Sequence, residues 1–443
     1  MVSLPKIFST DDLLIVFTYA PAGLGHLRVT DALYEALPID AKPLILGATD
    51  TRITWLHRLT SIHPFLRSLM EWVQQGKPQN IFTKYYRGWL RSHNQSLYEQ
   101  FSLLIDQHLI PTKTILVVAT HFGLAHQLAV VKEKLAQEKK VKIILVVQVT
   151  DDSPQHIWLV PGADLIVVPS ENTKQALDDY RREQGFRPIK IKTLPYPLSP
   201  KLMENLTSEE FDNKQRQLDP TQQHKINLAI PISGAAVGLN YFDQFITTLG
   251  KLNSNFEFLL ASRFSAYTKK FIFKMAQKKS VQIYLDRDDH RVVNLYEQLY
   301  KQTVVSLEIT KPSEQAFKVL LDPAQRGGAM MLFSQPVGRQ EYDNLKFMRE
   351  RGLIPNEAEQ KQLLDLYESQ QTPLAIFLEK IRSWRGVTVP SDPKLAAEFV
   401  YWLYQQQFFL EMLKYRPKAE LSPLEVSGQG SIKFWEEVAK LLE

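Results

Sequence analysis

The stretch LLIVFTYAPAGLGHLRVTDALYEAL, Leu13–Leu37, decides the fold. It opens with an apolar run, Leu13–Tyr19, that predicts a buried strand. A turn of small residues follows, and the apolar spacing from Leu27 to Leu37 predicts a helix with one buried face. A strand, a glycine turn and a helix in this order place free backbone N–H groups and the positive helix end beside the carboxyl edge of a parallel sheet. We therefore expect this turn to hold an anion or a polar group.

His26 stands at the opening of this helix, after Gly23 and Gly25. Its imidazole can accept or donate a proton near neutral pH. The two glycines do not complete the six-position dinucleotide fingerprint, and no ribose-binding acid follows at the usual distance. An ordinary strand-to-helix turn with a surface histidine therefore stays an alternative interpretation.

The rest of the chain alternates between strand-like and helix-like stretches, which favours parallel sheets with helices on both faces. The predicted fold class is α/β with two doubly wound, Rossmann-like domains facing a cleft, followed by C-terminal helices. A long helix is predicted at 396–415. Strands are predicted at 13–19, 43–48, 114–120, 142–150, 164–169, 189–194, 226–232, 256–261, 281–285, 304–309 and 329–333.

We expect four parts in the chain. Residues 1–200 form an N-terminal acceptor-binding domain. Residues 201–225 form a linker, because the stretch 195–222 holds four prolines among many polar residues. Residues 226–390 form a C-terminal donor-binding domain. Residues 391–443 are expected to be helices that pack back on the N-terminal domain.

Composition narrows the function class of this chain of 443 residues. It has no cysteine, which excludes disulfides, thiolate metal sites and a cysteine nucleophile, and fits a reducing compartment. The start of the sequence lacks the features of a signal peptide, and no apolar run has the length of a membrane span. A formal charge of +5 is too small to indicate nucleic acid. A cytoplasmic location is expected, with no nucleic-acid partner.

The segment 51–97 interleaves aromatic and basic residues. This composition suits a membrane interface, where rings settle among lipid headgroups and cations meet anionic lipid. Stacking on a single-stranded nucleic acid uses similar residues, and a helical insert with aromatic core residues is a third interpretation. We expect Lys84–Arg91, KYYRGWLR, with Tyr85, Tyr86, Arg87 and Trp89, to form a contact surface for an anionic membrane at the inner face of the plasma membrane.

Polar residues follow several strands of the first domain, where ligands of open α/β sheets bind. His121 follows the strand at 114–120, and Asp151 follows the strand at 142–150. Together with His26 they are expected at one edge of one sheet. A histidine with a carboxylate within reach can deprotonate an alcohol. A purely structural interpretation also stays open, because an aspartate or serine that follows a strand often caps the next helix, as Ser170 would do.

The second domain has a similar set of candidates. The turn at Ser233 and Gly234 and the helix start at Pro312 and Ser313 could hold phosphate oxygens, and Arg263 could neutralise a diphosphate. Side chains that suit sugar or ribose hydroxyls follow, namely Glu314, Gln340 and Glu341. The segment 286–288, Asp-Arg-Asp, is interpreted as a helix cap rather than a metal site.

Four motifs carry a family resemblance. They are Gly23-Leu24-Gly25-His26; Ala119-Thr120-His121-Phe122; the run from Val149 to Glu171 with its Thr-Asp, Trp, Gly-x-Asp and Pro-Ser-Glu order; and Lys311-Pro312 with Gly338–Asn344. The chain resembles two-domain glycosyltransferases of the GT-B fold, closest to monogalactosyldiacylglycerol synthase, processive diacylglycerol glucosyltransferases and the transferase that adds GlcNAc to lipid-linked peptidoglycan precursors. The likeness spans about residues 13–352.

The resemblance implies inverting transfer of a sugar from a UDP-sugar to a lipid or lipid-linked acceptor, without a metal or another cofactor. It makes His26 the candidate base, with His121 and Asp151 near the acceptor. It places the acceptor and membrane beside Gly23 and Gly25, and it adds Lys311 and Asn344 to the donor contacts. It also implies a peripheral membrane protein of glycolipid biosynthesis.

The chain departs from the family pattern in its donor loop. Lys311-Pro312 runs directly into Ser313-Glu314, where the family has paired glycines and a threonine before the glutamate. Two further functions therefore stay open besides a glycosyltransferase: a non-catalytic relative that binds a sugar nucleotide or a partner, and an epimerase acting on a UDP-sugar.

Overall fold

A computed structural model describes residues 4–19, 24–47, 76–108, 112–234, 236–333, 338–371, 375–416 and 426–443, with only the backbone described at 76–78. The chain divides into two compact units. Unit 1 comprises residues 1–200 and 429–443, and unit 2 comprises residues 201–428.

Unit 1 is built on a sheet of six parallel strands in the order β2-β1-β3-β4-β5-β6. The strands at the centre of this sheet are nearly continuous apolar runs, as expected for a parallel sheet covered on both faces, whereas the edge strand at 190–193 contains two lysines. The strands are β1 (Leu13–Tyr19), β2 (Leu44–Gly47), β3 (Thr114–Ala119), β4 (Lys142–Gln148), β5 (Leu165–Val168) and β6 (Lys190–Thr193). The helices are η1 (Lys6–Ser9), α1 (Leu24–Glu35), α4 (Gly76–Ser92), α5 (Gln95–Gln107), α6 (Phe122–Lys139), η2 (His156–Trp158), α7 (Glu171–Glu183) and α17 (Gly430–Leu442).

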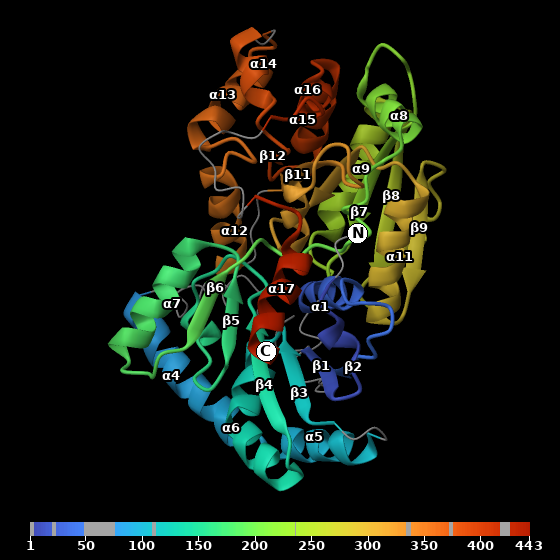
Figure 1. Cartoon of the computed structure of the whole chain (residues 1–443). Coiled ribbons are helices and arrows are strands. Elements are labelled where there is room, and N and C mark those ends of the chain that lie inside the picture. The colour runs from blue at the N-terminus through green and yellow to red at the C-terminus, as the bar shows by residue number, and fades with distance from the viewer. Residues whose placement is uncertain are drawn as a thin grey trace. The chain divides into compact units, whose positions relative to one another are not determined.

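The last helix of the chain, α17, belongs to unit 1 and packs beside α1 (Figure 1). Trp435 is fully buried, contacts the rings of Phe8 and Phe17 edge-on, and donates its indole N–H to the carbonyl oxygen of Leu33 at 2.8 Å. Gly430 at the start of α17 has no room for a Cβ, which would lie 2.2 Å from the carbonyl oxygen of Tyr196. Unit 1 therefore draws its core from both ends of the sequence.

Unit 2 has a second sheet of six parallel strands, in the order β12-β11-β10-β7-β8-β9. Its strands are β7 (Ile226–Pro231), β8 (Phe256–Arg263), β9 (Val281–Asp286), β10 (Leu307–Thr310), β11 (Ala329–Phe333) and β12 (Gly386–Val389). The helices are α8 (Ser208–Leu218), α9 (Leu239–Leu252), α10 (Lys269–Met275), α11 (Asp289–Gln302), η3 (Glu314–Leu320), α12 (Arg339–Glu350), α13 (Glu357–Glu368), α14 (Ala375–Ile381), α15 (Pro393–Gln405) and α16 (Phe408–Met412).

The predicted fold class is confirmed in that both units are α/β with a parallel sheet. Three predictions were wrong in detail. The segment 201–225, predicted to be a linker, contains α8, whose first turn is closed by a reciprocal cap between Thr207 and Glu210. The long helix predicted at 396–415 breaks at Gln407, which has a left-handed backbone (φ 60°) between α15 and α16. The strand β12 was not among the strands predicted from the sequence.

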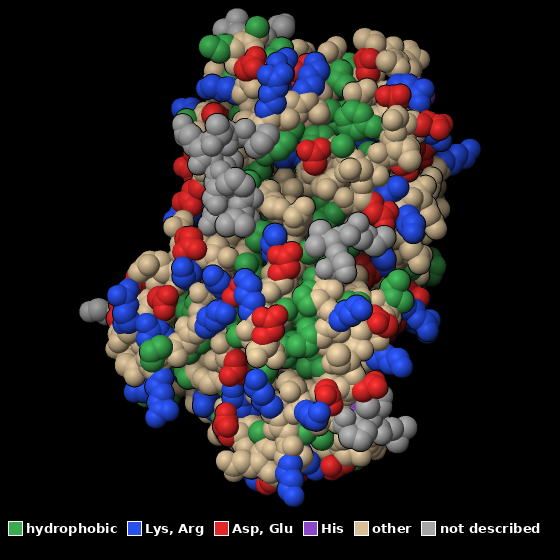
Figure 2. Space-filling model, viewed as in Figure 1, with side chains coloured by type: hydrophobic (Ala, Val, Ile, Leu, Met, Phe, Trp, Pro, Cys, Tyr) green, Lys and Arg blue, Asp and Glu red, His purple; other side chains and the backbone are tan. Residues whose placement is uncertain are grey.

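The predicted membrane segment is only partly described, because residues 51–75 lie outside the described residues. Its C-terminal part forms α4. Among the helices in the described part of the chain, none has both the length and the apolar character that a bilayer crossing requires. On the face seen in Figure 2, acidic and basic side chains are interspersed.

Candidate functional site

His26 lies where the strand order of unit 1 reverses. The first strand, β1, pairs with β2 on one side and β3 on the other, and ligands of open α/β sheets bind at such a reversal, beyond the carboxyl ends of the strands. His26 is in the first turn of α1, directly after β1, and Thr120 directly follows β3. The side chain of Thr30 joins the two elements, because its hydroxyl lies 2.8 Å from that of Thr120.

The protonation of His26 is fixed by a backbone carbonyl. Its Nδ1 lies 2.7 Å from the carbonyl oxygen of Thr120, which can only accept a hydrogen bond, so Nδ1 carries the proton. The hydroxyl of Thr150 lies 3.2 Å from the same nitrogen. In the neutral ring Nε2 is then unprotonated, and it is the atom that can accept a proton. The structure therefore gives His26 the tautomer that a general base requires.

Aromatic rings surround this histidine. The rings of His26 and His121 meet edge-on with centroids 5.2 Å apart, and Trp158 lies 6.3 Å from His26. His121 stacks on Phe122, whose ring meets Trp158 edge-on at 5.5 Å. Gly123 makes room for this packing, since a Cβ there would lie 2.8 Å from Cε1 of His121. The structure thus brings His26, His121 and Trp158 together at one edge of the sheet.

The two aspartates after β4 differ in their surroundings. Asp151 is half-buried and directly follows Thr150, the residue that contacts His26. Asp152 is buried, and its Oδ1 accepts hydrogen bonds from Ser170 at 2.5 Å and Thr173 at 2.7 Å. Ser170 also caps α7, as the structural interpretation of the sequence predicted. Asp152 therefore holds the start of α7, and Asp151 stays the candidate carboxylate.

The predicted acceptor and membrane residues have different outcomes. Gly25 lies in the first turn of α1, and Gly23 lies outside the described residues. Tyr85 is 75% exposed, Trp89 is 50% exposed and Tyr86 is half-buried between Phe82 and Trp89. The prediction for Arg87 was wrong, because this side chain is buried, with its guanidinium 4.7 Å from the ring centroid of Phe186. One side of α4 faces solvent and the other packs on unit 1, and Arg87 lies on the packed side.

The sheet of unit 2 reverses its order at β7, which lies between β10 and β8. Ser233 and Gly234 follow β7 and are half-buried, and the Ser233 hydroxyl accepts the N–H of Val237 at 3.2 Å. Ala236 in this turn has a left-handed backbone with φ 54°. Such a backbone is strained for alanine and free for glycine.

Residues after β10 and β11 meet at this same edge. The Lys311 ammonium lies 2.7 Å from Oε1 of Glu341, and the side-chain amide of Asn344 donates to the carbonyl of Pro312 at 3.2 Å. Glu341, Asn344 and Ser313 are buried, whereas Glu314 and Gln340 are half-buried. Asn344 therefore contacts the chain backbone just before the shortened loop, and the charge of Lys311 is balanced by Glu341.

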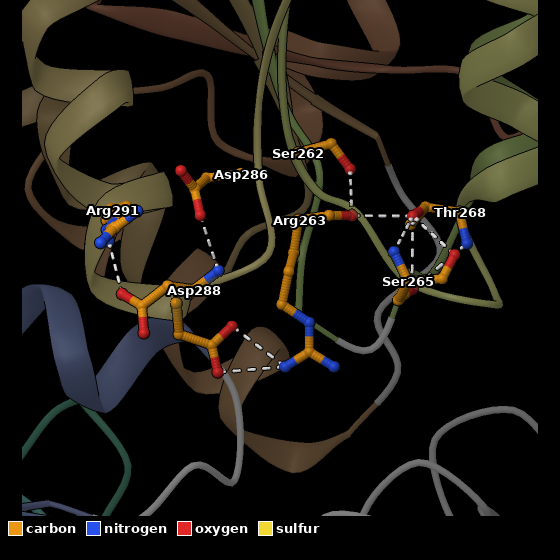
Figure 3. A network of polar contacts seen from close by, with 8 residues as sticks. Ser262, Arg263, Ser265, Thr268, Asp286, Asp288 and Arg291 are labelled. Carbon is orange, nitrogen blue, oxygen red and sulfur yellow. Dashed lines mark hydrogen bonds and ion pairs between the residues drawn. The ribbon is translucent and has the colours of Figure 1, made fainter.

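Arg263 ends β8 and points toward the start of α11, where its Nη1 lies 3.0 Å from both carboxylate oxygens of Asp289 (Figure 3). A neighbouring open pocket of about 600 Å³ lies beyond the carboxyl ends of β8 and β9. The guanidinium of Arg287 lies 5.6 Å from the ring centroid of Phe264. The pocket is lined by Phe264, Leu285, Asp286, Arg287, Asp288 and Arg291.

The sequence alone did not predict that these residues line a pocket. The segment 286–288 was interpreted as a helix cap, and that part is confirmed, since Asp288 accepts the N–H of Arg291 at 3.0 Å. Phe264 and Leu285 lie directly at the ends of two neighbouring strands, which is the signal that could have identified them. Among the described residues, no group of three or more His, Asp or Glu side chains is arranged to hold a metal ion.

Comparisons with known proteins support the fold. No protein-family model matches the sequence, and no curated protein matches it significantly. The S. aureus MnaA–UDP co-structure is similar, with a TM-score of 0.50 and 10% identity over 97% of this chain and 96% of that one. A putative UDP-N-acetylglucosamine 2-epimerase from Listeria monocytogenes has a TM-score of 0.50 and 9% identity over 98% and 97%. Arabidopsis thaliana UGT89C1 complexed with UDP has a TM-score of 0.46 and 11% identity over 97% and 99%. The two structures at 0.50 show that the chain has the GT-B type of fold.

Proposed function

We propose that this protein is an inverting glycosyltransferase that moves a sugar from a UDP-sugar to a hydroxyl of a lipid or lipid-linked acceptor. The observation that carries the proposal is the hydrogen bond between Nδ1 of His26 and the Thr120 carbonyl. It holds the proton on Nδ1, so Nε2 of the neutral ring is the nitrogen that can take the proton of an acceptor hydroxyl as that oxygen attacks the sugar. Asp151, two strands away from β1 in the sheet, is the candidate carboxylate of the same edge.

The nucleotide belongs to unit 2 in this proposal. The pocket beyond β8 and β9 offers the apolar side chains of Phe264 and Leu285 to a flat base. Arg263 and the N–H groups of the turn at Ser233 would stabilise the charge that develops on the leaving diphosphate. Arg263 would then exchange one carboxylate partner, Asp289, for phosphate oxygens. The S. aureus MnaA structure, which has a similar fold, contains UDP, which supports a uridine nucleotide as the ligand class.

Calorimetric titration of the full chain with UDP and with UDP-sugars tests the donor site. We expect Arg263→Met and Phe264→Ala to weaken UDP binding about tenfold or more, because each removes a charge-assisted or stacking contact. The matched control is Arg216→Met, which removes an exposed arginine of α8 in the same unit. The absence of any binding by the unmodified protein would contradict both the transferase and a nucleotide-binding relative.

An epimerase acting on a UDP-sugar is the second candidate. A structure of similar fold is described as a putative UDP-N-acetylglucosamine 2-epimerase. The two activities differ in their need for an acceptor: an epimerase converts the UDP-sugar alone, whereas a transferase releases UDP only when an acceptor is present. Incubation of radiolabelled UDP-sugars with and without a lipid extract separates them. Binding without turnover in either condition would favour a non-catalytic relative, which the short loop after Pro312 also suggests.

Peripheral contact with an anionic membrane is proposed for the exposed face of α4. Ile81, Tyr85 and Trp89 follow one another at four-residue spacing and are 61%, 75% and 50% exposed, so they form one stripe. Lys84 is exposed beside them. Aromatic rings at headgroup depth with a neighbouring cation favour an anionic bilayer surface.

Co-sedimentation with vesicles tests this contact. The double variant Tyr85→Ala/Trp89→Ala is expected to bind anionic vesicles more weakly than the unmodified protein. The control, Tyr342→Ala, removes a 52% exposed tyrosine of unit 2. Equal binding to neutral and anionic vesicles at low and high salt would contradict an electrostatic contribution to membrane binding.

A further inference from the structure

A group of buried polar side chains lies between α4, α6, η2 and α7 of unit 1, apart from the His26 edge. We call it the Arg87 cluster; it consists of Arg87, His126, Gln155, His156 and Tyr180. The His126 Nε2 donates to the carbonyl of Ile157 in η2 at 2.9 Å. The His156 ring stacks on the Tyr180 ring with centroids 3.9 Å apart and a 9° angle between planes.

Four polar atoms of this cluster are buried without a hydrogen-bond partner in the part of the chain that the structure describes. They are Nη1 of Arg87, Nδ1 of His126, Nε2 of Gln155 and the hydroxyl of Tyr180. The four side chains are 8%, 0%, 8% and 1% exposed, respectively. Leaving such an atom without a partner costs about 1–3 kcal/mol, so buried polar atoms of native proteins nearly always have a protein, water or ion partner. Four such atoms in one cluster leave unused hydrogen-bonding capacity for a species that is not part of the chain.

The charge of the cluster is positive and uncompensated. Among the described residues, Arg87 forms no ion pair with a carboxylate. Burial, with a smaller effect from the charge of Arg87, lowers the pKa of His126 to about 3 and that of His156 to about 4. Among the described residues, Arg91 is a further cation that acts on His126. Both histidines are therefore neutral at pH 7, and the described residues supply no carboxylate partner to the buried guanidinium, which makes its burial costly.

We propose that the Arg87 cluster binds a small inorganic anion, with Nη1 of Arg87 as its charged donor and Nε2 of Gln155 and the Tyr180 hydroxyl as further donors. The Nδ1 of His126 is an acceptor in the neutral ring and would be served by a water molecule that accompanies the anion. Water alone could satisfy the four atoms, but it would leave the guanidinium charge unbalanced. The proposal is independent of the UDP-sugar activity, because none of these residues belongs to the His26 edge or to unit 2.

Crystals grown or soaked in sodium bromide test the proposal directly. We expect an anomalous bromide peak within hydrogen-bond distance of Nη1 of Arg87, about 3.3 Å for this larger ion. A second soak in sodium phosphate distinguishes the kinds of anion: a tetrahedral peak there indicates an oxyanion, and bromide alone indicates a halide. Both results support the proposal. Ordered water without anomalous signal at high bromide, together with no phosphate density, would overturn it.

Thermal unfolding supplies a second readout. At constant ionic strength set with a large organic anion, bromide or phosphate is expected to raise the Tm of the unmodified protein saturably. At 100-fold excess over Kd the expected gain corresponds to about 2.7 kcal/mol. Arg87→Met is expected to lose this response and, in anion-free buffer, to be as stable as the unmodified protein or more stable, because it removes an unbalanced buried charge.

The control is Arg182→Met, which removes a largely exposed arginine of α7 that pairs with Asp179. It should keep the full anion response. An equal Tm increase in the Arg87→Met and unmodified proteins would show general salt stabilisation and would also overturn the proposal. Should Arg87→Met fail to fold, the bromide soak of the unmodified protein still decides the question.

Discussion

The Nδ1 nitrogen of His26 donates a hydrogen bond to the carbonyl oxygen of Thr120 at 2.7 Å. The two residues are 94 positions apart in the sequence and meet because β1 and β3 are neighbours in a parallel sheet. A backbone carbonyl cannot change its protonation, so it fixes the tautomer of the ring without adding a charge to the site. Any proton that His26 removes from a substrate must therefore go to Nε2.

Replacement of the proposed base should reduce the chemical step and leave nucleotide binding intact. We expect His26→Ala to lower kcat of sugar transfer by about 10²- to 10⁴-fold, the range typical of general base catalysis. Affinity for UDP, measured by calorimetry, should not change. The control is His93→Ala, an exposed histidine of the same unit. A full transfer rate in His26→Ala would remove this residue from the mechanism.

Gly123 and Gly88, both in helices of unit 1, allow a matched pair of substitutions, because a Cβ would meet close neighbours only at Gly123. Gly123→Ala places a methyl group 2.8 Å from Cε1 of His121, so the His121 ring must shift. We expect overpacking to cost about 1–3 kcal/mol of stability, partly offset by the better helix propensity of alanine. Gly88→Ala in α4 meets no atom within 4 Å and should stabilise the protein by about 0.5–1 kcal/mol. Chemical denaturation of both variants measures the difference, and a stabilising Gly123→Ala would show that His121 is not confined.

Replacement of Ala236 by glycine is expected to stabilise the protein. Its left-handed backbone (φ 54°) costs an alanine about 1–2 kcal/mol, which exceeds the entropy that glycine adds to the unfolded chain. Ala236→Gly should therefore raise the free energy of unfolding by up to about 1 kcal/mol. It should also tighten UDP binding, since the backbone of this turn becomes accessible to phosphate. Ala276→Gly, at a right-handed position with φ −62°, is the control and should not stabilise.

Acid should destabilise unit 1 through His126. Its pKa in the folded state is about 3, below the ordinary value of 6.5, because the ring is buried. Below pH 6.5 the unfolded chain binds a proton that the native state does not, so stability falls as the pH falls toward 3. At pH 5 this amounts to about 2 kcal/mol relative to pH 7.5. Urea unfolding of the unmodified protein and of His126→Leu at both pH values measures the contribution, with His93→Leu as the control. An equal pH dependence in all three proteins would contradict this assignment.

The alternation of apolar runs and amphipathic helices was enough to predict the two parallel sheets. Runs such as Leu13–Tyr19 and Ala329–Phe333 coincide with strands, because strands of a covered parallel sheet are apolar on both faces. The strand β12 was missed because it begins with a glycine, although other strands of four residues, such as β5, were predicted. Its Gly386 lowers strand propensity, yet the close approach of Met330 leaves no room for a Cβ there.

The candidate site was predictable only as far as strand order allows. His26, His121 and Asp151 could be assigned to one edge, because each follows a strand of the same sheet. Spacing alone does not determine the direction of a side chain. Three contacts depend on such directions: the hydrogen bond from His26 to the Thr120 carbonyl, the burial of Arg87 against Phe186, and the ion pair between Arg263 and Asp289. These partners were therefore found only in the structure.

The contribution of α17 to unit 1 constrains how the chain is made. A ribosome completes residues 1–200 long before Trp435 emerges, so the apolar surface around Phe8, Phe17 and Leu33 stays uncovered until α17 has been synthesised. Unit 2, whose residues are contiguous, can reach its native state first. Newly synthesised chains should therefore depend on chaperones in the interval, and a stop codon near residue 429, which removes α17, should destabilise unit 1 although residues 1–200 are intact.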